Sequence, residues 1–137
     1  MGCREMDINS EQWIKFMEMV HESNAEFAKG MVGDVTREVW SHSDNATIFG
    51  GYGGFVEPGW KNVETRLEAA AQKAMDGKYS YKLIKSSITG DSAYILQTEQ
   101  YVFPGNTVID LRVTIICQKE TDGWKIIHRH GEIIKPS

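Results

Sequence analysis

The chain has 137 residues and a net charge of −4, and 41% of its residues are hydrophobic and 25% charged. This composition suits one globular domain over residues 1–137, large enough to form a core without disulfides or a metal. The negative charge argues against nucleic acid as a partner, because phosphate backbones are bound by basic surfaces.

Three further features point to the cytoplasm. No run of about 18 apolar residues suggests a membrane span, and the first ten residues lack the apolar core of a secretion signal. Only two cysteines are present, Cys3 and Cys117, which favours a reducing compartment. We therefore expect a cytoplasmic protein with no membrane contact.

The first predicted helix begins at a cap on Asn9 or Ser10 and ends before Gly30, with residues 1–8 as a frayed tail. Apolar side chains recur in it at helical spacing: Trp13, Phe16, Met17, Val20, Phe27 and Met31. Such a stripe is more typical of a core-facing helix than of a cofactor site. Asn24 interrupts the stripe.

Asp34 can cap a short second helix over residues 35–42, and a short strand follows at 46–50. The next ten residues are rich in glycine and carry Tyr52, but they lack the spacing and the lysine of a phosphate-binding loop. We interpret them as a flap or wide turn whose aromatic residues could close over a pocket. A third helix begins at Trp60 and is closed by Gly77.

The second half of the chain consists of strands joined by short turns. The strands are predicted at residues 79–89, 92–103, 107–120 and 124–134. Three consecutive hairpins form an antiparallel meander, and helices followed by strands indicate an α+β domain. We expect the three helices to cover one face of a curved sheet of four or five strands, which then encloses a cone.

Several segments resemble the SnoaL-like branch of the nuclear transport factor 2-like superfamily, over about residues 13–134. These segments are VWSHSDNATIFGGYGG, PGWKNVETRLEAA, GDSAYI and LRVTIICQKETDGWKIIHRH. A similar ending occurs in the association domain of the calcium/calmodulin-dependent kinase. The resemblance implies a cone-shaped α+β barrel, related to cystatin-like and ketosteroid isomerase-like folds, with a deep pocket and usually a homodimer through sheet surfaces. It leaves the chemistry open, because members include isomerases, cyclases, dehydratases and non-enzymatic assembly modules.

Neither face of the last three strands is plainly polar. A solvated face would alternate more cleanly, so we expect helices on one face and a second subunit on the other. Composition alone puts the Trp124 face inward. The resemblance implies the reverse, with Arg112 and Arg129 in the cavity and Trp124, Ile126 and His128 toward the partner. A bulge or a one-residue slip would change the face of Arg129.

Arg112 is the strongest candidate for ligand binding, with Thr114 on the same face. A buried arginine needs a partner, and it could form a structural ion pair, for example with Glu99. Alternatively, its guanidinium could bind a carboxylate or another anionic group of a ligand.

Three residues near the expected pocket mouth have two readings each. Trp40 and Trp60 suit the core or the pocket wall, and His42 suits an exposed helix end or the pocket.

His128 and His130 point the same way on the last strand, but a metal site needs three or four ligands and the others are missing. We expect no metal and no cofactor. The two histidines then suit an interface or rim, or acid–base work.

The catalytic groups of an isomerase cannot be placed. A ketosteroid isomerase uses an aspartate base and an oxyanion hole, but the aspartates here lie in tails, caps and turns, except Asp110. Asp110 would pair with Arg112 rather than act as a base. We therefore expect a homodimer whose pocket binds a small anionic or carbonyl-bearing organic molecule, as an isomerase, cyclase or dehydratase or without catalysis. The alternative is a non-catalytic association module.

Overall fold

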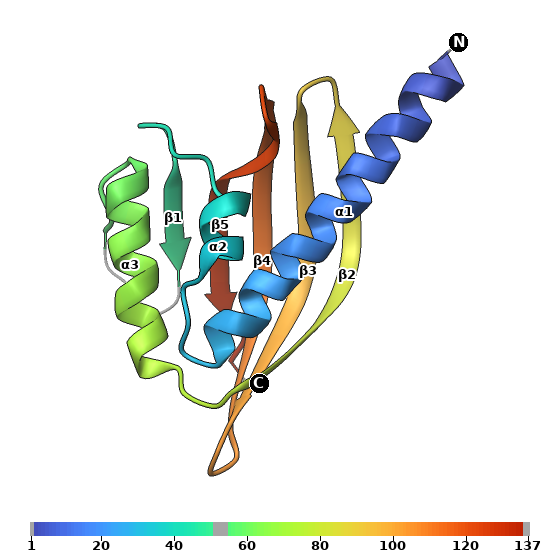
Figure 1. Ribbon diagram of the computed structural model, residues 1–137. Helices are drawn as coiled ribbons and strands as arrows, with labels where there is room; N and C mark the ends of the chain where they lie inside the picture. Colours follow the sequence, from blue (N-terminus) through green and yellow to red (C-terminus); the bar gives the residue numbers. More distant parts are fainter. Residues whose placement is uncertain (1, 51–54, 136–137) are drawn as a thin grey trace.

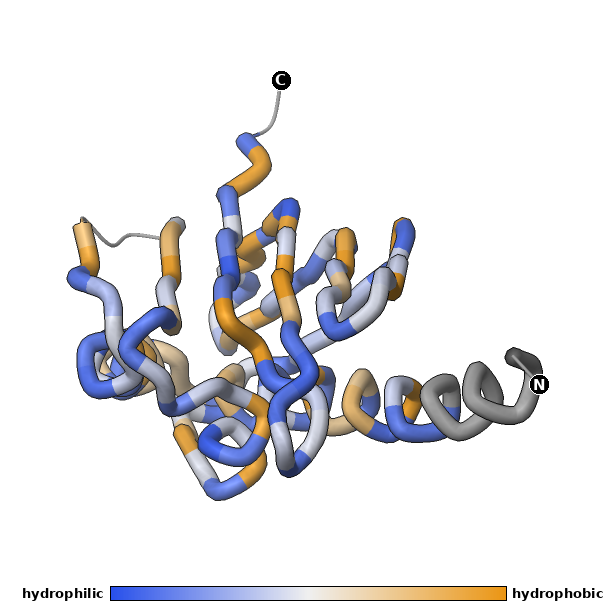
Figure 2. Tube along the Cα trace, turned by 90° about the horizontal axis from the view of Figure 1, so that it is seen from above, coloured by the Kyte–Doolittle hydropathy of each residue, from blue (hydrophilic) through white to orange (hydrophobic). Residues whose placement is uncertain are grey.

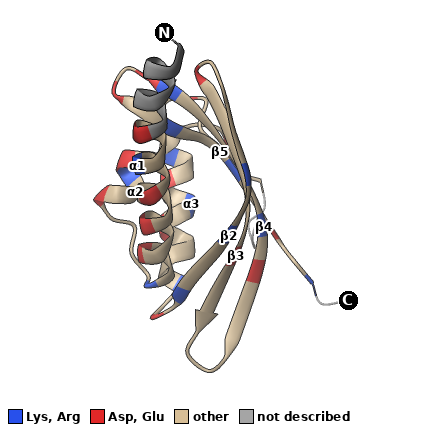
Figure 3. Ribbon diagram, turned by 90° about the vertical axis from the view of Figure 1, so that its right-hand side faces the viewer, with Lys and Arg blue, Asp and Glu red and all other residues tan. Residues whose placement is uncertain are grey.

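The computed structural model describes residues 2–50 and 55–135, with side chains from residue 11 onward. Three helices lie on one face of a five-stranded sheet, and no described helix or strand covers the other face (Figures 1 and 3). The elements are α1 (Gly2–Ala28), α2 (Asp34–Val39), β1 (Thr47–Gly50), α3 (Trp60–Lys73), β2 (Lys78–Thr89), β3 (Ser92–Phe103), β4 (Thr107–Glu120) and β5 (Gly123–Ile133). This arrangement confirms the predicted α+β class. None of the described helices is long and apolar enough to cross a membrane.

The helix boundaries differ from the predicted ones. α1 begins at Gly2, so the predicted caps at Asn9 and Ser10 lie inside the helix and residues 2–8 belong to it. α2 ends at Val39, because Trp40 is already extended and pairs with Ile126 of β5. α3 ends at Lys73, before the predicted stop at Gly77.

The strand order is β1-β5-β4-β3-β2. The last four strands form the predicted antiparallel meander, while β1 adds to the edge in parallel with β5. At the end of β1, Gly50 lies opposite Gly131 with a φ of 103°, and a Cβ atom there would collide with the carbonyl oxygen of Gly131. Only glycine suits this close approach of two backbones.

A β-bulge in β5 decides which side chains face the helices. Ile116 pairs with His128 and the next residue, Cys117, pairs with Ile126, so Ile127 is the extra residue. Because of this extra residue, Trp124, Ile126 and Arg129 share the inner face although their sequence spacing is not regular. Composition was therefore right about Trp124 and the resemblance was right about Arg129. The placement of Trp124 and Ile126 toward a partner subunit was wrong.

The core lies between α1, α2 and the inner sheet face. Trp13, Phe16 and Val20 of α1 are buried against the sheet, and the Trp13 ring meets Trp124 edge-on at 5.1 Å. Each such fully buried side chain contributes about 1.5–3 kcal/mol to folding. Figure 2 shows α1 from above, lying along the same side of the sheet as the other helices.

Candidate functional site

A cavity of about 440 Å³ lies between the helices and the inner face of the sheet. Its walls are largely apolar, with Phe27 from α1, Leu67 from α3 and Leu111 from β4 among them. Its charged lining residues are all cations, namely Arg66, Lys73 and Arg129, and no described aspartate or glutamate lines it. Concave apolar walls with a few polar groups are the usual composition of a small-molecule site.

Arg129 projects from β5 across β4 to Glu99 on β3, and the two side chains form a two-pronged ion pair. Nη2 of Arg129 lies 2.6 Å from Oε1 of Glu99, and Nη1 lies 3.0 Å from Oε2. The Glu99 side chain has no exposed surface, whereas that of Arg129 is 13% exposed. The carboxylate therefore lies behind the guanidinium, and the guanidinium lines the cavity.

Glu99 accepts hydrogen bonds from three further side chains. These donors are Gln97 Nε2 at 2.7 Å, the Tyr101 hydroxyl at 3.0 Å and Asn24 Nδ2 at 3.3 Å. Burial alone would raise the pKa of Glu99, but the charge of Arg129 and these hydrogen bonds outweigh it, so the pKa lies below its ordinary value. A carboxylate with five donors and a lowered pKa orients Arg129 and is unsuited to accept a proton as a general base.

Arg129 keeps donor groups in reserve. A guanidinium has five N–H donors, and Glu99 occupies two of them through Nη1 and Nη2. Burial would lower the pKa of Arg129, but the adjacent carboxylate raises it above its ordinary value, so the charge is permanent. The donors that Glu99 does not use are available to an anionic group in the cavity.

Buried polar side chains continue beyond Glu99 toward β2. Gln97 Oε1 lies 2.8 Å from Nε2 of His21, and the His21 ring stacks on Tyr81 at 3.5 Å. Burial lowers the pKa of His21 and raises that of Tyr79, whose hydroxyl accepts a hydrogen bond from Asn24. The neutral forms of both rings are thereby favoured.

The two other cations lie on α3. Arg66 is half-buried and donates from Nη2 to the carbonyl oxygen of Gly50 at 3.2 Å. Lys73 is two helical turns further on and is exposed, which places it at the mouth of the cavity. The place of Arg66 and Lys73 on the cavity side of this helix was not predicted.

Arg112 does not lie in the cavity, which corrects its predicted placement. It is on the outer face of β4, its side chain is 65% exposed, and Nη2 lies 2.6 Å from Oε2 of Glu132. Thr114 is on the same outer face, opposite His130, and does not line the cavity either. The resemblance gave the wrong face for this strand, and Glu99 pairs with Arg129 instead.

The aromatic candidates divide between the core and the cavity. Trp40 is 3% exposed and serves both, since it packs in the core and lines the cavity. Trp60 and His42 stack on each other at 4.6 Å outside the cavity lining, and Nε2 of His42 lies 2.7 Å from the carbonyl oxygen of Arg37. Tyr52 lies outside the described residues.

His128 and His130 lie on the outer face. Nδ1 of His128 is 2.7 Å from the Thr47 hydroxyl, and the Phe49 ring meets both histidines edge-on. Burial and the neighbouring His130 lower the pKa of His128. Among the described residues, no group of three histidine, cysteine or acidic side chains could hold a metal ion.

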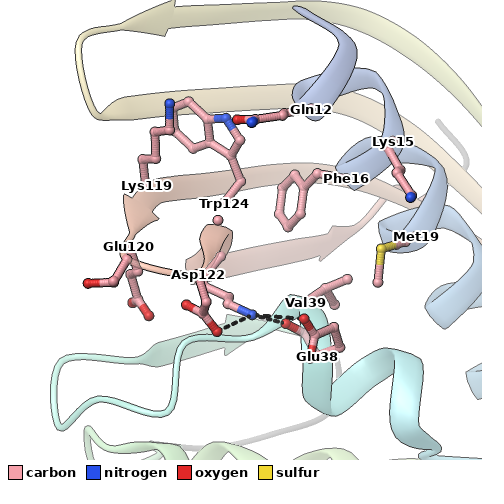
Figure 4. Close-up of a pocket in the computed structure, with 13 residues that line it drawn as sticks. Gln12, Lys15, Phe16, Met19, Glu38, Val39, Lys119, Glu120, Asp122 and Trp124 are labelled. Atoms are coloured by element: carbon pink, nitrogen blue, oxygen red, sulfur yellow. Dashed lines mark hydrogen bonds and ion pairs between the residues drawn. The ribbon is translucent and has the colours of Figure 1, made fainter. Parts of the chain in front are cut away.

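A second hollow of about 440 Å³ lies between α1, α2 and the β4–β5 turn (Figure 4). Nζ of Lys125 is held there by the Glu38 carbonyl oxygen at 2.7 Å and by carboxylate oxygens of Glu38 and Asp122 at 3.3 Å. The lining carries balanced charges, with Lys15, Lys119 and Lys125 against Glu38, Glu120 and Asp122. Lys125 therefore links the turn to α2. Because the positive and negative charges balance, this hollow has no excess charge to select a charged ligand.

Sequence reasoning missed the partner of Arg129. Gln97 and Glu99 share their strand face with Ile95 and Tyr101, so they are polar residues on an otherwise apolar buried face. Together with Asn24, which interrupts the apolar stripe of α1, they signal a buried polar network. Their pairing with Arg129 depends on the β5 bulge and could not be inferred from spacing.

No protein-family model and no curated protein matches the sequence. Solved structures do match over nearly the whole chain. A candidate calcium/calmodulin-dependent protein kinase type II association domain from Thiobacillus denitrificans has a TM-score of 0.74 at 15% identity, over 88% of this chain and 93% of that one. An uncharacterized protein with a cystatin-like fold from Caulobacter vibrioides has a TM-score of 0.70 at 16% identity, over 93% and 91%.

A third match is an NTF-2-like protein of unknown function from Shewanella oneidensis, with a TM-score of 0.68 at 14% identity, over 90% of this chain and 98% of that one. At such identities the likeness concerns the fold and leaves the activity open. The chain therefore has the cystatin-like fold of the NTF-2-like proteins, as the resemblance implied.

Proposed function

We propose that the protein is a homodimer whose cavity binds a small organic anion, with Arg129 as the anchoring group. The observation that carries this proposal is the charge of the lining: three cations and no described acid around apolar walls. A carboxylate or a similar oxyanion matches the remaining N–H donors of Arg129 in shape, and Arg66 and Lys73 supply the positive charge. The Tyr101 hydroxyl and the Asn24 amide beside Glu99 add polarity at the same place.

Binding without catalysis is favoured over an isomerase, cyclase or dehydratase activity. Each of those reactions needs a group that removes a proton, and the carboxylate nearest the cavity, Glu99, is saturated with donors and has a lowered pKa. The pKa of the Tyr101 hydroxyl is raised by burial and by Glu99, so it also stays protonated. Cys117, a buried free thiol, suits the cytoplasm, where we place the protein.

The test uses the anionic aromatic probe 1-anilinonaphthalene-8-sulfonate, titrated by fluorescence and by calorimetry. We expect saturable binding with one site per chain. Arg129→Lys keeps a charge for Glu99 but loses the planar donors, so we expect the affinity to fall about tenfold. Arg112→Gln is the matched control, because it removes an exposed arginine from the outer face and should leave binding unchanged. Equal binding by Arg129→Lys and the unchanged protein would refute the proposal.

The dimer is proposed to form through the uncovered sheet face. Two cross-strand rows meet there, one with Tyr94, Ile116 and His128 and the other with Leu96, Thr114, His130 and Phe49. Phe49 on the edge strand β1 is 50% exposed and Ile116 on the central strand β4 is 42% exposed, which is high for such large apolar residues. We call this surface the outer patch. The Thiobacillus denitrificans structure is described as an association domain, which agrees with assembly through this fold.

Sedimentation equilibrium tests the dimer. We expect a dimer for the unchanged protein and a monomer for Ile116→Asp, because a buried unpaired carboxylate at the interface is costly. Val108→Asp serves as the control, since Val108 is exposed near the β3–β4 turn, away from the outer patch. The dimer would be contradicted if the unchanged protein is still monomeric at about 100 μM, because a typical stable dimer has a lower dissociation constant.

A further inference from the structure

We infer that the ligand carries two acidic groups joined by an apolar segment, the inner one bound at Arg129 and the outer one at Lys73, with Arg66 between. This inference rests on the proposed function, because it assigns a chemical class to the ligand of the same cavity. It depends on the cations of α3 rather than on Arg129 alone.

The first step is the balance of charge. Glu99 neutralises Arg129, but Arg66 and Lys73 have no acidic partner in the described part of the chain, where Arg66 bonds only to the carbonyl oxygen of Gly50. Arg37 of α2, by contrast, is paired with Glu64. A ligand with one acidic group at Arg129 would leave Arg66, which is half-buried in the cavity wall, without a counter-charge.

The second step is the position of the charges along the cavity. Arg66, Ala70 and Lys73 lie at positions i, i+4 and i+7, so they share one face of α3, and all three line the cavity. At a rise of 1.5 Å per residue, Arg66 and Lys73 are about 10 Å apart along the helix. Ala70 contributes only a small side chain between them, which leaves room for a ligand along the helix.

The third step places Arg66 toward the interior. Its guanidinium is bonded to Gly50, and Gly50 pairs with Gly131 in the neighbouring strand. Nη2 of Arg129 is 3.7 Å from the point where a Cβ atom of Gly131 would lie. Both guanidinium groups therefore approach the same pair of glycines, while Lys73 is exposed at the mouth. Positive charge runs from Arg129 outward to Lys73.

The fourth step is the surface between the two ends. Phe27, Phe103, Ile109 and Leu111 line the cavity between the helices and the strands. Such walls favour methylene groups or a ring and disfavour a compact, strongly hydrated anion such as phosphate or citrate. The class that fits is a dicarboxylic acid with an apolar spacer.

The experiment compares octanoate with octanedioate, which share a chain length and differ in the second acidic group. Calorimetric titration of the unchanged protein is expected to show octanedioate binding about fivefold tighter than octanoate, the gain from one partly exposed ion pair. In Lys73→Gln this advantage should disappear while octanoate binding is unchanged. Lys61→Gln is the matched control, because Lys61 is exposed on the same helix but does not line the cavity.

A series of diacids from pentanedioate to dodecanedioate locates the best spacer, and an optimum at one length supports two fixed binding points. The inference is overturned if no diacid binds more tightly than the monoacid of the same length, or if Lys73→Gln keeps the advantage of the diacid. If the monoacids bind and Arg129→Lys weakens them, the proposed function then survives without the second group. If no monoacid or diacid binds, or binding ignores Arg129, both proposals fall together.

Discussion

Replacing Glu99 by Gln should strongly destabilise the fold, because it leaves the buried charge of Arg129 without a counterion. The introduced amide would also present an N–H₂ group toward a guanidinium that is itself only a donor. The three other donors to the carboxylate, on Gln97, Tyr101 and Asn24, lose part of their acceptor as well. The whole network therefore depends on one negative charge.

The magnitude follows from the burial of the pair. Breaking a buried ion pair by removing one partner costs about 3–5 kcal/mol. The Glu99 side chain is fully buried, but Arg129 keeps some contact with the cavity, where water can solvate it. We expect the lower end, a loss of about 3 kcal/mol in the free energy of unfolding, or a fall of roughly 10 °C in Tm.

Urea unfolding followed by tryptophan fluorescence measures this loss, at one protein concentration because assembly would add to stability. Glu64→Gln is the matched control. Its carboxylate lies 2.8 Å from Arg37 in a half-exposed pair, and Arg37 keeps a hydrogen bond to Val32, so the expected cost is below about 1 kcal/mol. The double variant Glu99→Gln/Arg129→Met should recover part of the loss, because no charge is left unpaired.

Two results would refute this reasoning about Glu99. One is a cost for Glu99→Gln no greater than that for Glu64→Gln, which would mean that water or another group solvates Arg129. The other is a double variant less stable than Glu99→Gln alone, which would mean that Arg129 stabilises the fold by packing rather than through its charge.

Three further predictions concern acid stability, backbone geometry and thiol reactivity. The pKa of Glu99 is lower in the fold than in the unfolded chain, so its contribution to the free energy of unfolding is complete above about pH 4.3 and is lost as the pH falls through the folded pKa. In urea titrations from pH 3 to 7, Glu99→Gln should lack this part of the acid destabilisation. The same pH dependence in both proteins would contradict the prediction. Gly50→Ala should cost about 2 kcal/mol or more in urea unfolding, while Gly131→Ala, whose Cβ meets only ordinary contacts, should cost less than about 1 kcal/mol; equal costs would show that the close approach is not rigid. Burial raises the pKa of the Cys117 thiol, so in a Cys3→Ser background a disulfide reagent should label it only on unfolding, and rapid labelling of the native protein would disprove its burial.

The sheet was predictable because its signals are local. Period-two alternation and turn residues fixed β3 and β4 at their observed bounds, and the turns hold Gly90, Gly105 and Asn106 at positive φ. The short β1 was found from its β-branched residues, but its parallel pairing with β5 was not, because that pairing is a contact between distant segments.

The candidate site was predicted only in part, for a physical reason. Arg129 and Trp40 line the cavity as expected, but Arg112 and Thr114 do not. Both faces of their strand carry apolar and polar residues, so the alternation does not indicate which face is the inner one. The extra residue of β5 falls at two consecutive isoleucines, 126 and 127, and nothing in such a run says which of them leaves the ladder. Arg66 and Lys73 looked like ordinary surface residues, because helical spacing alone does not say that a cavity reaches them.

The bulge at Ile127 gives β5 two reading frames that are joined in the middle. Before the bulge, the even-numbered residues Trp124 and Ile126 face inward, and Ile126 pairs with Cys117. After it, the odd-numbered residues face inward, and Arg129 pairs with Ile115. If the strand kept Ile127 but lost the bulge, it would have a single frame, and keeping Trp124 in the core would then turn Arg129 outward and bring His128 and His130 to the inner face. One inserted residue thus separates the packing of the domain from the chemistry of its cavity, and sequence changes on one side of it need not be matched on the other.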